Sequence, residues 1–285
     1  MSELHGIDLQ PASEHDAIAG EYVSCSAIQF NDAAIRLLQR VDCVMACIPE
    51  AALIDAMPVL DRLMAPDKLV VDIASVKSPI AAAYERHRCA VGHVGLHPMF
   101  APLPDFSGRG MAMVVVRANE RSAAFEGLVR SWGVDPCLLS AAEHDRTTAS
   151  IQALPHTALI AFGATLANSG IPFETMWKLA TPIHKTLLGL LSRVAGRDQS
   201  VHYSIQADNP FAEAARGDLQ ARIAALSAQV KAGDEAGFCE QLQQTYAWLK
   251  PAEPQIRALA NGVVDLTRAV AAPAHPEDPA AIGIE

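Results

Sequence analysis

Short apolar runs alternate with segments of helical periodicity through the first half of the chain. The runs have the length and the flanking turn residues of strands, and they lie at 4–9, 41–48, 68–73, 89–96 and 111–117. Between them, apolar residues recur at helical spacing, at 34–38, 50–64 and 80–87. Strands that alternate with helices predict a parallel sheet covered on both faces.

The second half of the chain has a different pattern. From about Asp145 onward apolar residues recur only at helical spacing, and helices are predicted near 145–170, 176–195, 219–230, 238–249 and 256–266. Asp145 is predicted to cap the first of these helices. A stripe in 219–230 predicts a packed helix face, formed by Leu219, Ile223, Leu226 and Val230. The pattern predicts an α/β domain over 1–140, an all-helical domain over 141–271 and a disordered tail over 272–285.

Composition limits the partners and the compartment. The 285 residues suit about two domains, and the net charge of -10 argues against nucleic acid or an anionic membrane as the main partner. No apolar run approaches the ~18 residues of a membrane span, and the opening MSELHGIDLQ lacks the pattern of a signal peptide. The six cysteines include no C-x-x-C pair, and Cys43 and Cys47 are predicted to be buried free thiols. We therefore expect a reducing cytoplasm.

Candidate chemistry gathers where the predicted strands end. Ligands of such sheets bind beyond the carboxyl ends of the strands, and Pro49, Ser75 and His97 fall at those ends. The unperturbed pKa of a histidine is near neutral, so His97 suits a general base, although a structural histidine is the alternative. Lys77 suits an anionic substrate, the alternative being a serine cap followed by a solvated lysine. His93 and His97 are four residues apart in a strand, which is no metal signature, and no metal is predicted.

Three further residues have both a structural and a functional interpretation. Asp8 ends an apolar run, but a ribose-binding acid normally follows a strand and a glycine-rich turn, and neither precedes Asp8 in this chain. By spacing alone, Asp8 is a strand-end or capping residue. His156 follows Pro155, which is expected to kink its helix. Arg193 lies among leucines, where its guanidinium either reaches solvent or grips a carboxylate.

Five stretches in a fixed order carry a specific resemblance. They are VDIASVK (71–77), VGLHPMFAP (94–102), SAAEHDRTTASIQALPH (140–156), ATPIHKTLLGLLSRVAGRD (180–198) and HYSIQADN (202–209). Together they make the chain resemble the prephenate dehydrogenase family of tyrosine biosynthesis over roughly residues 4 to 265. The resemblance implies a Rossmann-like domain that lacks its first strand and glycine-rich loop, followed by a helical dimerisation domain.

The resemblance also implies a reaction and residue roles. NAD or NADP takes a hydride from C4 of prephenate while a base takes the proton of the 4-hydroxyl, and loss of carbon dioxide gives 4-hydroxyphenylpyruvate. The implied roles are His97 as base, Ser75 as its orienting residue, Arg193 as carboxylate ligand, Lys77 and His156 as pocket residues, Asp8 as ribose ligand, and Ile48 and Pro49 as the turn over the cofactor. The helical half implies a homodimer.

The departures from the family pattern leave alternatives open. Without a glycine-rich loop the pyrophosphate loses backbone N–H donors. The chain is then either a dehydrogenase whose start is displaced or truncated, or a cofactor-free relative that binds prephenate-like ligands or tyrosine. A third alternative is a dehydrogenase of an amino-substituted prephenate. Asp8 favours NAD because its charge would repel a 2′-phosphate. Prephenate versus arogenate and feedback by tyrosine stay open, and Pro155 puts contacts near His156 in question.

Overall fold

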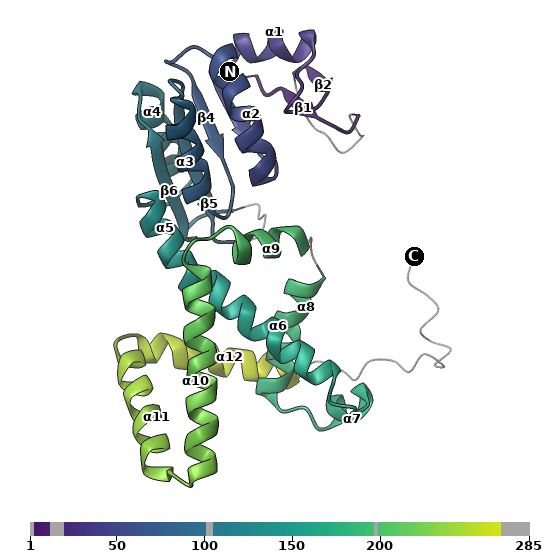
Figure 1. The fold of residues 1–285 in the computed structure, drawn as a ribbon, viewed down its shortest axis with the longest axis vertical. Coiled ribbons are helices and arrows are strands. Elements are labelled where there is room, and N and C mark those ends of the chain that lie inside the picture. Colours follow the sequence, from purple (N-terminus) through teal and green to yellow (C-terminus); the bar gives the residue numbers. More distant parts are fainter. Residues whose placement is uncertain (1–2, 12–19, 101–104, 197–198, 269–285) are drawn as a thin grey trace, which may run out of the picture. The chain divides into compact units, whose positions relative to one another are not determined.

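The computed structural model describes residues 3–11, 20–100, 105–196 and 199–268, so the predicted tail at 272–285 lies outside the described residues. The chain forms two compact units (Figure 1). The first comprises Met1–Gln152 with Tyr203–Glu213, and the second comprises Ala153–His202 with Ala214–Glu285. The predicted order, an α/β part followed by a helical part, is confirmed.

The first unit is built on a mixed sheet with the order β3-β4-β5-β6-β7. Its strands are β3 (Cys43–Ala46), β4 (Leu69–Asp72), β5 (Gly92–Pro98), β6 (Met111–Arg117) and β7 (Cys137–Leu138). β3, β4 and β5 are parallel as predicted, but β6 runs antiparallel to β5. A parallel connection usually needs a helical crossover, and the described residues between β5 and β6 include no helix.

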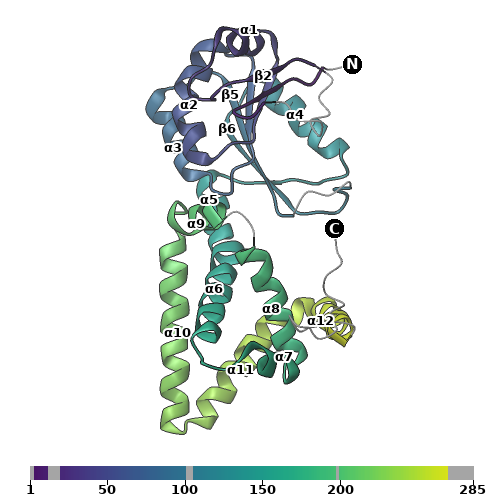
Figure 2. The same ribbon diagram turned by 90° about the vertical axis from the view of Figure 1, so that its right-hand side faces the viewer.

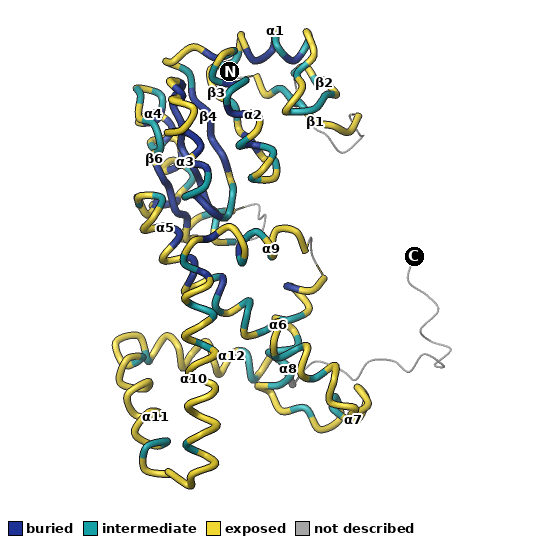
Figure 3. The backbone as a smooth tube through the Cα atoms, viewed as in Figure 1, coloured by how far each residue is buried: buried dark blue, intermediate teal, exposed yellow. Residues whose placement is uncertain are grey.

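Helices cover both faces of this sheet. Figure 2 shows α2 (Glu50–Leu63) and α3 (Ser78–His87) on one side and α4 (Glu120–Ser131) on the other. Successive β4 residues face opposite sides: Val70 packs in a core with α2 and α3, whereas Leu69 and Val71 pack against residues of α4. The central strands are the buried part of the unit (Figure 3). The predicted two-sided burial is therefore confirmed.

The amino-terminal segment forms a separate two-stranded parallel sheet. β1 (Gly6–Asp8) matches a predicted strand, and it pairs with β2 (Tyr22–Ser24), which was not predicted. The chain then enters α1 (Asp32–Arg40). β3 is an edge strand of the larger sheet, with Met45 47% exposed. The prediction of a fully buried strand is wrong there, and Cys43 and Cys47 are exposed rather than buried.

The register brings three strand ends to one edge of the sheet. Ala46 of β3 pairs with Asp72 of β4, and Asp72 pairs with Gly95 of β5. The chain leaves this edge through Ile48 and Pro49 after β3, and through the segment 73–77 after β4. Every residue predicted at a strand end except Asp8 is therefore near one edge.

Helices make up the rest of the described chain. Between α5 (Ala141–Thr148) and α6 (Leu154–Ala167), residues Ala149–Ala153 form one π-helical segment. The remaining helices are α7 (Phe173–Lys178), α8 (Pro182–Ala195), α9 (Gln199–Ala207), α10 (Ala212–Ala232), α11 (Glu235–Leu249), a 3-10 turn at Lys250–Ala252, and α12 (Glu253–Arg268). Within the second unit, α6 and α12 both pack against α8. No described helix is both long and apolar enough to cross a bilayer.

A π-helical segment, Ala149–Ala153, lies just before Pro155, where a kink was predicted, and such segments are one cause of helix kinks. Three other sequence-based expectations about the helices need correction. Ser140, not Asp145, caps α5, through a capping box with Glu143. The helix predicted at 176–195 breaks into α7 and α8 because the Thr181 side chain caps a new helix that has proline in its first turn. The stripe on α10 is not packed within the chain, since Ile223 is 55% and Val230 66% exposed.

Candidate active site

A buried chain of hydrogen bonds begins at the end of β5. His97 is the residue just before Pro98, the last residue of that strand, and its Nδ1 lies 2.9 Å from Nε2 of His144. His144 has its own Nδ1 2.7 Å from Oδ1 of Asp145. His97 is 4% exposed, and the other two side chains are fully buried. We call His97, His144 and Asp145 the His–His–Asp triad.

Asp145 is fixed by the first turn of another helix. Its Oδ1 accepts from the backbone N–H of Lys77 at 2.9 Å and its Oδ2 from that of Ser78 at 2.7 Å. These are unsatisfied donors at the N-terminus of α3, so Asp145 caps α3 instead of its own helix. Burial opposes ionisation of Asp145, but the hydrogen bonds from His144, Ser78 and Lys77 outweigh it and hold the pKa of the carboxyl below its usual value. Asp145 is therefore an ionised acceptor.

His97 is neutral in this environment. Burial first, and then the neighbouring His144 and Lys77, lower the pKa of His97 to about 3, against the opposing effect of Asp145 and Asp72. A neutral imidazole has a lone pair with which to accept a proton, as the predicted role of base requires. Because so low a pKa also makes a weak base, the protonated form needs support from nearby carboxylates.

Lys77 belongs to a second buried group, which we call the Asp72 network: Asp72, Lys77 and His93. The Lys77 Nζ donates to Asp72 Oδ1 at 2.5 Å and to the Leu96 carbonyl at 2.8 Å. His93 Nε2 lies 2.8 Å from the other Asp72 oxygen. Burial opposes ionisation of Asp72, but His93 and Lys77 together lower its pKa. Lys77 is 1% exposed, so the alternative of a solvated lysine is wrong, and its ammonium is engaged by the protein itself.

The loop 73–77 carries Ser75 between β4 and α3. Ser75 is half-buried in this loop and is not a helix cap, because α3 begins at Ser78 with Lys77 in the capping position. The loop therefore places Ser75 at the carboxyl-end edge of the sheet, at which β5 also brings His97.

Arg193 and His156 lie in the second unit. Arg193 is exposed in the last turn of α8, in agreement with a guanidinium that reaches beyond the surrounding leucines. His156 is half-buried in α6, and its ring meets that of His202 edge-on, with centroids 4.9 Å apart. Burial first and His202 second lower the pKa of His156. Both residues belong to the second unit, whereas the triad belongs to the first.

The residues predicted to hold a dinucleotide all lie in the first unit. Asp8 is exposed at the end of β1, and its Oδ1 also accepts from the backbone N–H of Gln10 at 2.9 Å. An exposed carboxylate at a strand end can accept hydrogen bonds from ribose hydroxyls. Ile48 and Pro49 form the turn from β3 into α2, and Pro49 holds the capping position there. Among the residues that the structure describes, no group of three or more His, Cys, Asp or Glu side chains is arranged so that it could hold a metal ion.

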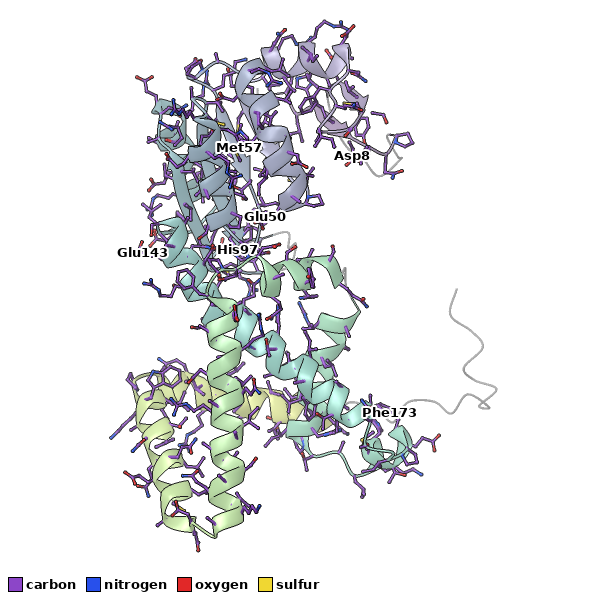
Figure 4. The ribbon with its side chains drawn as sticks, in the orientation of Figure 1. Asp8, Glu50, Met57, His97, Glu143 and Phe173 are labelled. Atoms are coloured by element: carbon purple, nitrogen blue, oxygen red, sulfur yellow. The ribbon has the colours of Figure 1, made fainter. Side chains whose placement is uncertain are left out.

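Sequence reasoning missed three buried or half-buried acids and histidines. His144 and Asp145 follow a capping box in an otherwise ordinary polar helix, so only their contact with β5 and α3 reveals them. Glu50 opens α2, where an acid is common at a helix N-terminus. In the structure burial first, and then Asp208, Asp145 and Asp72, raise the pKa of Glu50 to about 8. Figure 4 labels Glu50 and His97 near the same end of the sheet.

Two family models match most of the chain. The prephenate dehydrogenase nucleotide-binding domain matches residues 4–113, and the prephenate dehydrogenase dimerization domain matches residues 140–244. A 4-amino-4-deoxyprephenate dehydrogenase from Streptomyces pristinaespiralis is 37% identical over 205 residues, which are 72% of this chain and 69% of the relative. The T-protein of Enterobacter agglomerans is 31% identical over 187 residues, or 64% of this chain and 49% of that protein.

Solved structures share the fold at low sequence identity. A prephenate dehydrogenase from A. aeolicus, in complex with hydroxyphenyl propionate and NAD+, superposes with a TM-score of 0.72 at 19% identity and covers 89% of each chain. An arogenate dehydrogenase from Synechocystis superposes with a TM-score of 0.62 at 20% identity, over 81% of this chain and 83% of that one. The Rossmann-like sheet followed by helices is thus the common architecture of this chain and both structures.

Proposed function

Because the chain belongs to the prephenate dehydrogenase family, we propose that it catalyses the NAD-dependent oxidative decarboxylation of prephenate to 4-hydroxyphenylpyruvate. The observation that supports this most directly is His97, a neutral and buried imidazole at the carboxyl-end edge of the sheet. Its Nδ1 is engaged by His144, so its Nε2 is the nitrogen that meets substrate.

Each of the proposed site residues has a defined role in the reaction. His97 Nε2 accepts the proton as the O–H bond of the 4-hydroxyl breaks, and a hydride leaves C4, which becomes a carbonyl carbon. The bond between the ring and its carboxylate then breaks, carbon dioxide leaves, and the electron pair of that bond completes the aromatic ring. The oxygen on C4 becomes a phenolate, which takes the proton back from His97 to form the 4-hydroxyl of the product. Bound NAD supplies the acceptor for the hydride that leaves C4. Ser75 is proposed to orient His97, Arg193 to bind a substrate carboxylate and His156 to contact the substrate. The Lys77 ammonium is engaged by Asp72 and the Leu96 carbonyl, so Lys77 is proposed to hold β4 and β5 in place rather than to contact the substrate directly.

Asp8, Ile48 and Pro49 are the proposed cofactor residues. The match of a nucleotide-binding family model over 4–113 supports a bound dinucleotide over a cofactor-free relative. The exposed Asp8 carboxylate favours NAD over NADP, because a 2′-phosphate next to it would be repelled. The predicted compartment for this chemistry remains a reducing cytoplasm.

One comparison favours a second substrate. The relative from Streptomyces pristinaespiralis is named for 4-amino-4-deoxyprephenate, which differs from prephenate by an amino group in place of the 4-hydroxyl. The same site would then take a proton from nitrogen instead of oxygen, with hydride transfer and decarboxylation unchanged. Arogenate, with an amino acid side chain in place of the pyruvyl group, is the third member of this substrate class.

The chain is proposed to act as a homodimer through its helical part. The dimerization family model covers 140–244, a range that includes α10. The apolar stripe of α10 faces solvent in the single chain, with Ile223, Leu226 and Val230 all exposed. A second copy would bury such a stripe and so remove apolar area from water.

The test measures reduced cofactor from the purified chain with prephenate, arogenate or 4-amino-4-deoxyprephenate, each with NAD and with NADP. We expect turnover with NAD and prephenate, and a fall in kcat of about a hundredfold or more in His97→Asn. His87→Asn, which alters an exposed histidine at the end of α3, should keep wild-type kinetics. Faster turnover of the amino substrate would replace prephenate with the second candidate, and no turnover of any would refute the proposal.

A further inference from the structure

The hydrogen bonds of the His–His–Asp triad determine where its protons lie. Asp145 accepts two backbone N–H groups, which are donors only, and its carboxyl is ionised. An ionised carboxylate has no proton to give, so His144 Nδ1, at 2.7 Å, must be the donor of that bond. The proton of a neutral His144 is therefore on Nδ1, and its Nε2 carries a lone pair.

The same logic extends one step to His97. With a lone pair on His144 Nε2, the 2.9 Å contact is a hydrogen bond only if His97 Nδ1 carries the proton. We propose that His144 and Asp145 are positioning residues that hold His97 in its Nδ1–H tautomer, with the Nε2 lone pair directed to the reacting proton. Neither residue touches the substrate, and both act through His97.

The catalytic consequence rests on the proposed function. When His97 Nε2 accepts the substrate proton, the ring becomes an imidazolium that still donates through Nδ1 to His144. The charged and titratable groups that face this ring are His144 and Asp145 from α5, Lys77 from the loop before α3, and Asp72 from β4. Lys77 opposes the new positive charge, whereas Asp145 stabilises it through His144. The triad thus offsets the destabilising effect of burial on the imidazolium that forms during proton transfer, as in other sites where a third group orients a catalytic base.

The surroundings keep the triad in place. Asp145 is tied to the backbone of α3 by two hydrogen bonds. The Asn209 side chain donates to the Asp145 carbonyl at 2.8 Å and to the Thr148 hydroxyl at 3.2 Å. The side chains of Asp145, Asn209 and Thr148 are buried, and all of these groups belong to the first unit. An orienting group held in this way loses little further conformational freedom in the reaction.

The direct test is the tautomer of His97. Two-bond ¹⁵N–¹H correlation spectra of ¹⁵N-histidine-labelled chain at near-neutral pH report which ring nitrogen carries the proton, and His97→Gln assigns the signals by their loss. We expect Nδ1–H with unprotonated Nε2 in the wild type. In His144→Phe, which removes the acceptor, we expect the Nε2–H form to appear. This readout needs neither cofactor nor turnover, so it stands even if the proposed reaction fails.

The kinetic test uses a matched pair at one position. His144→Phe should lower kcat about 10- to 1000-fold with KM changed less than about threefold, because an orienting group acts on the transition state. His144→Gln retains an acceptor for His97 Nδ1 and should recover part of the lost kcat. Thr147→Ala changes an exposed residue of the same helix, and it controls for a general disturbance of α5.

Three results would overturn the inference. One is an Nε2–H tautomer of His97 in the wild type, which would mean that His144 donates to His97. Another is a folded His144→Phe with unchanged kcat, and the third is a Gln variant no better than Phe. If His144→Phe does not fold, the tautomer in the wild type and in His144→Gln decides the matter. Absence of turnover in the wild type would refute the proposed function and leave the tautomer result intact.

Discussion

At the scale of the residue, Glu50 shows how the site is tuned by its surroundings. It follows Pro49 at the start of α2, and the pKa of its carboxyl is raised from 4.5 to about 8, mainly by burial and then by the nearby Asp208, Asp145 and Asp72. The folded protein therefore binds this proton more tightly than the unfolded chain does. Stability contributed by the neutral carboxyl is fully present below about pH 4.5 and is lost as pH rises through about 8.

Glu50→Gln should flatten this pH dependence. Because the amide cannot ionise, we expect the variant to gain stability relative to the wild type as pH rises from 5 to 9, by about 2 kcal/mol after allowance for solvent screening. Chemical denaturation at several pH values in that range measures the difference. Glu85→Gln, an exposed change on α3, should show no such trend. A constant offset between the Glu50 variant and the wild type at every pH would contradict the shift.

At the scale of the element, β5 is shaped around the Asp72 network. Gly95 lies beside β4, and a Cβ there would stand 2.9 Å from Lys77 Cδ and 3.0 Å from Asp72 Oδ2. Both neighbours are buried and bonded to each other, so neither can move without loss of a charged hydrogen bond. The absence of a side chain at this position allows β5 to pass the network and to present His97 two residues later.

Two glycine-to-alanine substitutions should therefore have opposite effects. Gly95→Ala should destabilise the protein by about 1–3 kcal/mol through overpacking. Gly127→Ala should stabilise it by about 0.5–1 kcal/mol, because Gly127 is exposed within α4, nothing lies within 4 Å of its added Cβ, and alanine favours helix. Urea unfolding of both variants checks the pair. Equal changes in the free energy of unfolding would mean that the Asp72 network rearranges around the added Cβ more easily than its geometry indicates.

At the scale of the whole molecule, the helical part presents apolar surface that the single chain leaves in water. Along α10, α11 and α12 the exposed apolar side chains are Ile223, Leu226, Val230, Leu242, Tyr246, Trp248, Ile256, Leu259 and Leu266. Scattered exposed apolar residues are ordinary, but a stripe of them on a predicted core face is typical of an interface. The proposed homodimer accounts for a helix pattern that would otherwise be unexplained.

Charges placed on the α10 stripe should separate the proposed dimer. Ile223→Asp combined with Val230→Asp would bury two carboxylates in an apolar interface, which is strongly unfavourable. We expect sedimentation velocity to show a shift from dimer to monomer. Gln220→Asp adds a charge on the same helix at an exposed polar position and should leave the dimer intact. A wild-type chain that sediments as a monomer would contradict the proposal.

The sequence by itself determined the succession of an α/β part and a helical part, and the family. Hydrophobic periodicity is local, so it identified β3, β4, β5 and β6 and the helices between them, and it placed His97 and Ser75 at strand ends. Five stretches of sequence also indicated the family, and all five lie within the ranges that the two family models match. Hydrophobic periodicity could not predict the antiparallel direction of β6 or the existence of β2, because neither depends on a periodic pattern.

Only the tertiary structure decided what the polar residues do. Asp145 looked like a helix cap in sequence, and it does cap a helix, but α3 rather than its own. Lys77 was expected to meet a substrate or solvent, yet it is buried against Asp72, while His144 had no local feature to distinguish it. The roles of His144 and Asp145 arise from hydrogen bonds between residues 47 and 68 positions apart, His97 with His144 and Lys77 with Asp145. Local patterns encode burial and periodicity, whereas such pairings exist only once the sheet and helices have packed.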